Sequence, residues 1–256
     1  MRFPGYDLRE RLARSDVLDV HEAWSHERGC SVIIKALRPD RRGDAAAARA
    51  LRREGRLLRR FSHPHLVRAY DVLADPTDAV VLETLGGETL AHLVRRRDRR
   101  LSAVELCFLA QHLCSAVGYL HRQGYVHLDL KPSNVVADGG RAKLIDLSIA
   151  RRPGRARAGV GTWCYLAPEQ AAGGHVDTPA DVWGIGGVLW EAATGTCAFG
   201  DERDEDHELP VLHRRADSVR SLRPRLPPAL SDVIDACLEP DPADRPTVAD
   251  VLAVSR

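Results

Sequence analysis

The sequence contains very little lysine for its number of charges. Only three of its 37 basic residues are lysine, at positions 35, 131 and 143, and the other 34 are arginine. A lysine ammonium is a compact charge on a flexible stem, whereas an arginine guanidinium is a rigid planar fork. Because the chain uses arginine almost everywhere else, we expect Lys35 and Lys131 to occupy positions that require an ammonium group.

Other features are also scarce, and each absence excludes a class of protein. The formal net charge is only +1, which argues against general binding to nucleic acids or membrane surfaces. No apolar run approaches the roughly 20 residues that cross a bilayer, and the first residues do not form a signal peptide. The six cysteines show no Cys-x-x-Cys spacing, so we interpret them as reduced, mostly buried thiols rather than as a disulfide framework or a zinc site. We therefore expect a cytoplasmic protein without membrane insertion.

One stretch carries residues suited to phosphoryl transfer. Residues 127–134 read His-Leu-Asp-Leu-Lys-Pro-Ser-Asn, and a second aspartate, Asp146, follows a short predicted strand. Asp129 can accept a hydroxyl proton, and Lys131 can neutralise charge on a phosphoryl group in transit. Asn134 and Asp146 offer the hard oxygen ligands that Mg²⁺ prefers. Through these residues the chain resembles the eukaryotic-like serine/threonine protein kinases of bacteria. Lysine at position 131 is the residue that favours serine and threonine over tyrosine in that family.

The N-terminal part is predicted to form an antiparallel β ribbon followed by a helix. The expected strands are residues 6–12, 20–24 and 31–37. In the resemblance, Lys35 ends the third-strand motif and holds the α- and β-phosphates of ATP. Residues 44–61 have helical spacing, with an apolar face made of Ala47, Ala50, Leu51, Leu58 and Phe61. Glu54 falls on that face, and because an unpaired buried carboxylate is costly, we expect it to pair with Lys35 rather than to be solvated.

The resemblance also implies a glycine-rich loop over the phosphates, and here the chain departs from the family. The loop corresponds to residues 12–20, and its three glycine positions hold Ala13, Ser15 and Leu18, with Val20 next. Side chains at these positions limit how closely the backbone can approach phosphate groups. The sequence therefore predicts a degenerate nucleotide loop.

The adenine side of the implied nucleotide site contains a second departure. Ile33 stands where the family usually has a small alanine, and it should crowd an adenine ring. A short buried strand at residues 80–83 precedes Gly86 and Gly87, which the resemblance makes the hinge between two lobes. It also makes Leu82 the gatekeeper, with the backbones of Glu83 and Leu85 facing adenine.

The C-terminal part is predicted to be mainly helical. Ser102 and Glu105 form a capping box that opens a long helix ending at Gly124. Its apolar positions keep helical spacing, which predicts a core helix; they are Leu106, Leu109, Ala110, Leu113, Val117 and Leu120. Further on, Thr178 is expected to cap a second buried helix that Pro179 opens, and Thr247 to cap the final one.

The resemblance makes residues 127–134 the catalytic loop and assigns contacts around it. Asp181 is expected to accept hydrogen bonds from the loop backbone, against the alternative of a simple first-turn acid. Thr162 is expected to touch Asp129 and Lys131, and Arg245 to be the buried partner of Glu169.

The activation segment has an unusual composition. Leu128 stands where many kinases have an arginine that receives an activation-loop phosphate. Residues 149–161 contain no serine, threonine or tyrosine. Because the two absences agree, we infer that phosphorylation within this segment does not switch the activity.

The resemblance implies an α+β, two-lobed protein-kinase fold, with a small antiparallel β-sheet lobe carrying one helix and a larger, mainly helical lobe. We expect a single kinase domain over 1–256, with the first lobe at about 1–83, the hinge at about 83–87 and the second lobe at about 88–256. The expected function is ATP- and Mg²⁺-dependent phosphorylation of serine and threonine hydroxyls in protein substrates. The alternatives are a pseudokinase that binds and regulates a partner with little or no nucleotide binding, and a small-molecule phosphotransferase.

An acidic cluster leaves the choice of substrate open. It consists of Asp201, Glu202, Asp204, Glu205, Asp206 and Glu208. We interpret it as a solvated loop, and the alternative is attraction of basic protein substrates. The sequence indicates no oligomeric state.

Overall fold

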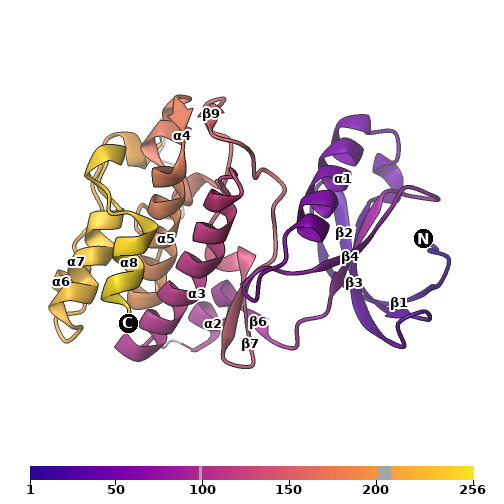
Figure 1. The fold of residues 1–256 in the computed structure, drawn as a ribbon, viewed down its shortest axis with the longest axis horizontal. Coiled ribbons are helices and arrows are strands. Elements are labelled where there is room, and N and C mark those ends of the chain that lie inside the picture. The colour runs from indigo at the N-terminus through magenta and orange to yellow at the C-terminus, as the bar shows by residue number, and fades with distance from the viewer. Residues whose placement is uncertain (98–99, 201–208) are drawn as a thin grey trace. The chain divides into compact units, whose positions relative to one another are not determined.

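The computed structural model describes residues 1–97, 100–200 and 209–256, and the side chains of residues 96 and 97 are not described. The chain divides into two units. The N-terminal unit contains Met1–Gly86 together with Asp146–Ser148, and the C-terminal unit contains Gly87–Ile145 together with Ile149–Arg256. The two units are described separately below (Figure 1).

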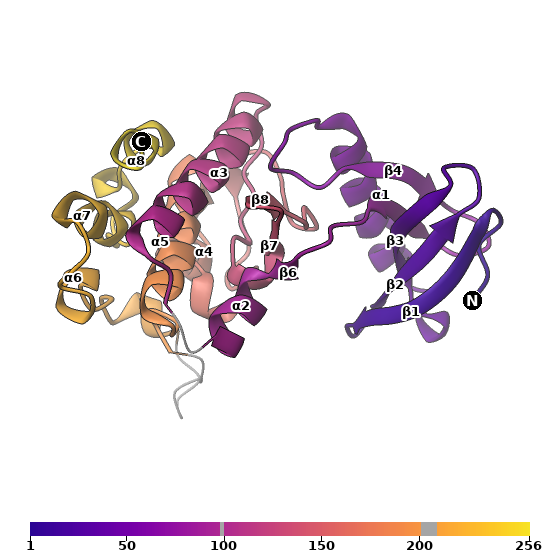
Figure 2. The same cartoon turned by 90° about the horizontal axis from the view of Figure 1, so that it is seen from below.

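The N-terminal unit is built on a five-stranded antiparallel sheet and one α-helix. The sheet order is β1-β2-β3-β5-β4, and Figure 2 shows β1, β2 and β3 side by side. The elements are β1 (Tyr6–Arg14), β2 (Leu18–Ser25), β3 (Cys30–Leu37), α1 (Ala45–Arg60), β4 (Ala69–Leu73) and β5 (Ala79–Glu83). The first three strands confirm the predicted ribbon, and β5 confirms the short strand predicted at residues 80–83.

One face of this sheet carries the core of the N-terminal unit. Val32, Ile34 and Ala36 alternate along β3 and are fully buried against Phe3 and Val81. Because side chains alternate between the two faces of a strand, Ile33 and Lys35 lie on the opposite face. The alternation therefore directs the lysine away from the apolar cluster.

Helix α1 confirms the predicted amphipathic helix, with one correction. Asp44 caps its first turn by accepting hydrogen bonds from the amides of residues 46 and 47. Leu51, Leu58 and Glu54 are buried as expected, but Ala50 is exposed and Ala48 is buried in its place. The buried stripe is thus rotated slightly from the expected one, so that it includes the small residue Gly55, which packs close to Val80.

The C-terminal unit contains the other helices and two small sheets. Its strands are β6 (Glu88–Thr89), β7 (Val135–Asp138), β8 (Arg141–Leu144), β9 (Gly154–Arg155) and β10 (His175–Val176). Its α-helices are α2 (Leu90–Arg97), α3 (Ala103–Arg122), α4 (Pro168–Ala172), α5 (Thr178–Thr194), α6 (Val219–Leu222), α7 (Pro228–Cys237) and α8 (Val248–Val254). The sheets have the orders β6-β7-β8 and β10-β9. An antiparallel sheet unit and a helical unit confirm the predicted fold class.

Helices α3 and α5 form the centre of the C-terminal unit. They pack on each other, α3 also packs on α8, and α5 also packs on α7 (Figures 1 and 2). The predicted capping box at Ser102 and Glu105 is present, and the six predicted apolar positions of α3 are buried. By length and composition alone α3 could cross a membrane, a criterion that buried core helices also meet. Every residue of α5 from Ala180 to Thr194 is buried.

The structure corrects two smaller predictions. The cap of α5 is Asp177, whose carboxylate accepts a hydrogen bond from the Thr178 amide, so Thr178 is the first helical residue rather than the cap. The six cysteines form no disulfide, all of them lying in described parts of the chain, but only Cys114 and Cys237 are fully buried. The other four are half-buried. Thr247 caps α8 as predicted.

Candidate active site

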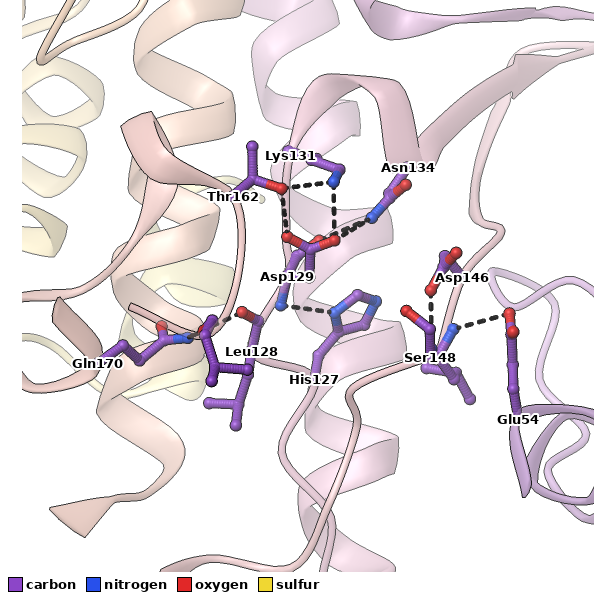
Figure 3. Close-up of polar contacts among 12 residues, drawn as sticks. Glu54, His127, Leu128, Asp129, Lys131, Asn134, Asp146, Ser148, Thr162 and Gln170 are labelled. Atoms are coloured by element: carbon purple, nitrogen blue, oxygen red, sulfur yellow. Dashed lines mark hydrogen bonds and ion pairs between the residues drawn. The ribbon is translucent and has the colours of Figure 1, made fainter. Parts of the chain in front are cut away.

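Lys35 lies at the centre of a buried charge cluster in the N-terminal unit. Its Nζ atom is 2.9 Å from both carboxylate oxygens of Glu54 and 2.8 Å from Oδ2 of Asp146. The Glu54 side chain is only 1% exposed, and the predicted pairing with Lys35 is present. Leu147 donates its amide to Glu54, and Ser148 donates its amide to Oδ1 of Asp146 (Figure 3). The cluster thus joins β3, α1 and the segment 146–148 through one ammonium group.

The charges in this cluster determine its protonation. Burial acts to lower the pKa of Lys35, but the charges of Glu54 and Asp146 outweigh it and raise the pKa above its usual value. Burial acts to raise the pKa of Asp146, but the charge of Lys35 and the hydrogen bonds from Lys35 and Ser148 lower it to about 2. Burial raises the pKa of Glu54, and the charge of Lys35 opposes this shift. At neutral pH an ammonium group therefore faces an ionised Asp146.

A cavity of about 400 Å³ opens beside Lys35 within the N-terminal unit. Its lining includes the predicted loop residues Ala13, Ser15, Leu18 and Val20, together with Lys35, Glu54 and Asp146. This size lies within the range of small-molecule pockets, about 300–1,000 Å³. The structure therefore brings the predicted loop positions and the predicted phosphate-binding lysine to one cavity.

Side chains hold the glycine-free loop of this cavity in a tight hairpin. The Ser15 amide donates to the Leu18 carbonyl at 2.8 Å, and the Leu18 amide donates to the Ser15 hydroxyl at 3.0 Å. The Arg38 guanidinium donates to the carbonyls of Ser15 and Asp16, both at 3.1 Å. Sequence reasoning missed Arg38, because a single arginine after a strand gives no signal of its contact across the sheet.

The residues predicted on the adenine side do not line this cavity. Ile33 pairs with Leu82 across β3 and β5, and Leu82 is buried. Glu83 donates its amide to the Arg68 carbonyl, so this amide already has an acceptor within the protein. Leu85 is half-buried. The roles of these residues toward adenine stay predictions.

Asp129 is the centre of a second cluster, in the C-terminal unit (Figure 3). Its Oδ1 accepts a 2.7 Å hydrogen bond from the Thr162 hydroxyl. Its Oδ2 lies 2.8 Å from Nζ of Lys131 and 3.0 Å from the amide nitrogen of Asn134. Lys131 also donates to the Thr162 hydroxyl. The structure thus places three predicted site residues around the Asp129 carboxylate, which is the arrangement of a proton acceptor beside a cation.

Buried charges hold the backbone that carries Asp129. Asp181 accepts hydrogen bonds from the amides of His127 and Leu128, both at 2.8 Å, which confirms the predicted contact. His121 also contacts Asp181, at 2.8 Å. Leu128 has φ 67°, a left-handed conformation that side chains other than glycine adopt rarely. Satisfying two consecutive amides with one buried carboxylate makes this strained turn possible.

A buried ion pair fastens the segment that follows Thr162. Arg245 donates to both carboxylate oxygens of Glu169, at 2.8 and 2.9 Å, and the Arg245 side chain is fully buried. The same guanidinium donates to three backbone carbonyls, of residues 179, 239 and 240. The predicted pairing of Arg245 with Glu169 is confirmed.

Residues 8–255 match the family model described as the protein kinase domain. The chain belongs to the protein kinase family. It is 33% identical over 247 residues to serine/threonine-protein kinase PkaA of Streptomyces coelicolor, covering 93% of this chain and 45% of that protein. It is 32% identical over 226 residues to serine/threonine-protein kinase PknB of Mycobacterium leprae, covering 84% of this chain and 36% of that protein. These kinases support the expected activity and do not favour the pseudokinase alternative.

The chain is also similar to a plant protein kinase, and each of these alignments covers only part of the length of the relative. The chain is 30% identical over 264 residues to CBL-interacting serine/threonine-protein kinase 1 of Arabidopsis thaliana, covering 99% of this chain and 58% of that protein. The chain thus spans less than two thirds of the length of each of these curated relatives.

Two residues of this kinase-family chain have oxygen atoms suited to Mg²⁺. The Asn134 side-chain nitrogen is already used, because it donates to the backbone and side-chain oxygens of Asp129, and its amide oxygen remains as the ligand atom. The low pKa of Asp146 keeps its carboxylate ionised. The described residues contain no group of three or more His, Cys, Asp or Glu that could hold a metal ion. Mg²⁺ needs no such cage, since it is usually bound by one or two protein oxygens together with substrate phosphates.

Sequence reasoning missed two further contacts in the kinase-family chain. It did not foresee that Lys35 reaches Asp146, because 111 positions separate them in sequence. It also missed Gln170, whose buried side chain contacts Leu128, because a glutamine in a short helix carries no chemical signal by itself. The acidic cluster at residues 201–208 lies outside the described residues.

Proposed function

We propose that this chain is an ATP-dependent serine/threonine protein kinase. The observation that carries the proposal is the environment of Asp129, whose carboxylate is held by Thr162, Lys131 and Asn134 at hydrogen-bonding distance. A carboxylate fixed in this way can orient a serine or threonine hydroxyl and accept its proton. The names of the relatives PkaA and PknB support serine/threonine kinase activity and a protein as the phosphate acceptor.

The proposed reaction is the transfer of the γ-phosphoryl group of ATP. A bond forms between the acceptor oxygen and the γ-phosphorus, the bond from the γ-phosphorus to the bridging oxygen of ADP breaks, and the hydroxyl proton passes to Asp129. Lys131 stabilises negative charge on the group in transfer. Lys35 would hold the α- and β-phosphates, and its pairing with Glu54 keeps the ammonium group charged and positioned.

Side-chain oxygens and the phosphate loop are the remaining parts of the proposed site. Asn134 and Asp146 are the residues that would hold Mg²⁺, which when bound would neutralise charge on the phosphate oxygens. Ser15 and Leu18 close the phosphate loop without glycine, so this loop offers the phosphates less backbone contact than a glycine-rich loop.

A phosphate-transfer assay with matched lysine variants tests the proposal. The purified chain is incubated with Mg-ATP and a basic carrier protein, and incorporated phosphate is counted by mass spectrometry. We expect Asp129→Asn and Lys35→Met to reduce incorporation by about a hundredfold or more, because they remove the proton acceptor and the phosphate-binding cation. Lys143→Met is the control, since it removes the third lysine, which lies on β8 and pairs with Val136 of β7.

Two results would contradict the proposed function. One is a wild-type chain that incorporates no phosphate and shows no thermal shift with Mg-ATP. The other is incorporation that persists in Asp129→Asn, which would assign the phosphate to a contaminating kinase.

A further inference from the structure

Gln170 makes an unusual set of contacts for a residue of a five-residue helix. Its side chain is 3% exposed, and its amide nitrogen donates to the carbonyl of Leu128 at 2.9 Å and to that of Val160 at 3.3 Å. Its side-chain oxygen accepts from the Ala167 amide, and its backbone carbonyl accepts from the Gly159 amide at 3.0 Å. One buried residue thus connects α4, the catalytic loop and the activation segment, all within the C-terminal unit.

The first contact fixes the peptide that leads into Asp129. The Leu128 carbonyl belongs to the peptide bond joining Leu128 to Asp129, and Figure 3 shows Gln170 beside it. Asp181 holds the amide of Leu128, and Gln170 holds its carbonyl. Because Leu128 has the left-handed φ of 67°, its backbone would relax toward a more common conformation if either contact were lost. Such a relaxation would turn the Asp129 carboxylate away from its partners.

The second contact fixes the segment that delivers Thr162. Val160 precedes Thr162 by two residues, and the Thr162 hydroxyl donates to Asp129. Gly161 lies between them with φ 137°, and a side chain there would come within 2.6 Å of Leu166 and 3.3 Å of the Leu128 carbonyl. The activation segment therefore approaches the catalytic loop closely at Gly161, directly beside the Gln170 amide.

The chain lacks the groups that would hold this segment by phosphorylation. Residues 149–161 contain no serine, threonine or tyrosine, and Leu128 carries no charge that could receive a phosphate. Backbone contacts hold the segment, and they include the pairing of β9 with β10 and a hydrogen bond from the Ala156 amide to the Gly174 carbonyl. Gln170 links this segment to the catalytic loop through Val160 and Leu128, beside the direct hydrogen bond from the Thr162 hydroxyl to Asp129.

We propose that Gln170 is a positioning residue for phosphoryl transfer. Its side-chain amide orients Asp129 through Leu128 and Thr162 through Val160, so that the activation segment is held in its working position without a phosphate. This inference rests on the proposed function and extends it to the way in which the site is kept ordered.

Two variants of Gln170 and one matched control test the inference. Gln170→Met keeps the volume of the side chain but removes both donors, and Gln170→Glu places a second acceptor against two carbonyls. Gln111→Met is the control, because the Gln111 amide on α3 also donates to a backbone carbonyl, that of Ser255, away from the catalytic loop. The measurements are kcat, the KM for ATP, the thermal midpoint, and hydrogen exchange of the peptides that cover residues 125–134 and 156–163.

We expect kcat to fall by about 10- to 100-fold in both Gln170 variants, because a small misplacement of a catalytic group costs that much. The KM for ATP should stay within about twofold, because the Lys35 cluster is untouched, and exchange should rise in both peptides. Gln111→Met should keep the wild-type kcat and the wild-type exchange of both peptides.

Unchanged kcat in folded Gln170→Met would overturn the inference, as would an equal loss in Gln111→Met. A wild-type chain without activity would overturn the proposed function and the catalytic part of the inference together. Unchanged exchange in both peptides would then also overturn the positional part.

Discussion

Asp146 offers a direct test of the charge cluster in the N-terminal unit. Its carboxylate accepts hydrogen bonds from the Lys35 ammonium at 2.8 Å and from the Ser148 amide at 2.7 Å. We predict that Asp146→Asn lowers the free energy of unfolding at neutral pH, because the ammonium loses one of its two charged partners. Lys35 keeps Glu54 in this variant, so the substitution does not leave a buried cation without a counter-charge.

The magnitude follows from the pKa of Asp146. A shift from 3.8 to about 2 corresponds to about 2 kcal/mol of unfolding free energy, and the side chain is only 21% exposed, so solvent screening removes little of it. Because the pKa of Asp146 is lower in the folded state, the unfolded chain binds more protons between pH 4 and pH 2. This stabilisation is therefore fully present above about pH 4, and it is lost as the pH falls toward 2.

Urea unfolding of the two chains from pH 6 down to pH 2.5 measures this effect. The wild type should exceed Asp146→Asn by about 2 kcal/mol at pH 6, and the difference should shrink through the acidic range. Asp7→Asn is the control, because Asp7 is an exposed carboxylate of the same unit that pairs with exposed His26, and surface pairs contribute little. A difference between wild type and Asp146→Asn that stays constant from pH 6 to pH 2.5 would refute the assigned pKa and its cause.

Two further predictions concern the C-terminal unit. Arg245→Met should lower the free energy of unfolding in urea by about 3–5 kcal/mol, because it leaves the Glu169 carboxylate without its buried partner. The control, Arg215→Met, removes an exposed ion pair and should cost at most about 1 kcal/mol. Equal effects of the two substitutions would contradict the role of burial. Gly87→Ala would place a methyl carbon 1.7 Å from the Ala137 carbonyl oxygen and should lower the free energy of unfolding by about 1–3 kcal/mol. The control is Gly43→Ala, whose methyl carbon meets no atom within 4 Å. Equal thermal midpoints for the two variants would contradict the close approach of residue 87 to β7.

The sequence predicted the elements whose signals are local. The capping box of Ser102 and Glu105, the strand at residues 31–37 and the helical spacing of α3 depend on neighbouring residues, and the structure contains all three. Glu54 was predictable for a different reason, since a carboxylate on an apolar stripe demands a cation and the chain has few lysines. Such signals are strong because each one limits what a short stretch can do.

The contacts that sequence reasoning missed depend on tertiary geometry. Asp146 reaches Lys35 across a long sequence separation, Arg38 reaches the tip of the β1–β2 hairpin, and Gln170 reaches Leu128. In each case the residue type fits many environments, and the backbone path selects the partner. The sequence places the cap of α5 one residue too late because Asp177 and Thr178 are both good capping residues, and the local backbone decides between them.

The lysine cluster has a consequence for covalent labelling. Only an unprotonated amine attacks an electrophile, and the two carboxylates that raise the pKa of Lys35 keep almost all of it protonated at neutral pH. Amine-directed reagents such as activated esters should therefore leave Lys35 unmodified in the folded chain. Reaction at this position would instead report opening of the N-terminal unit, so that a chain with three lysines carries its own chemical probe of unfolding.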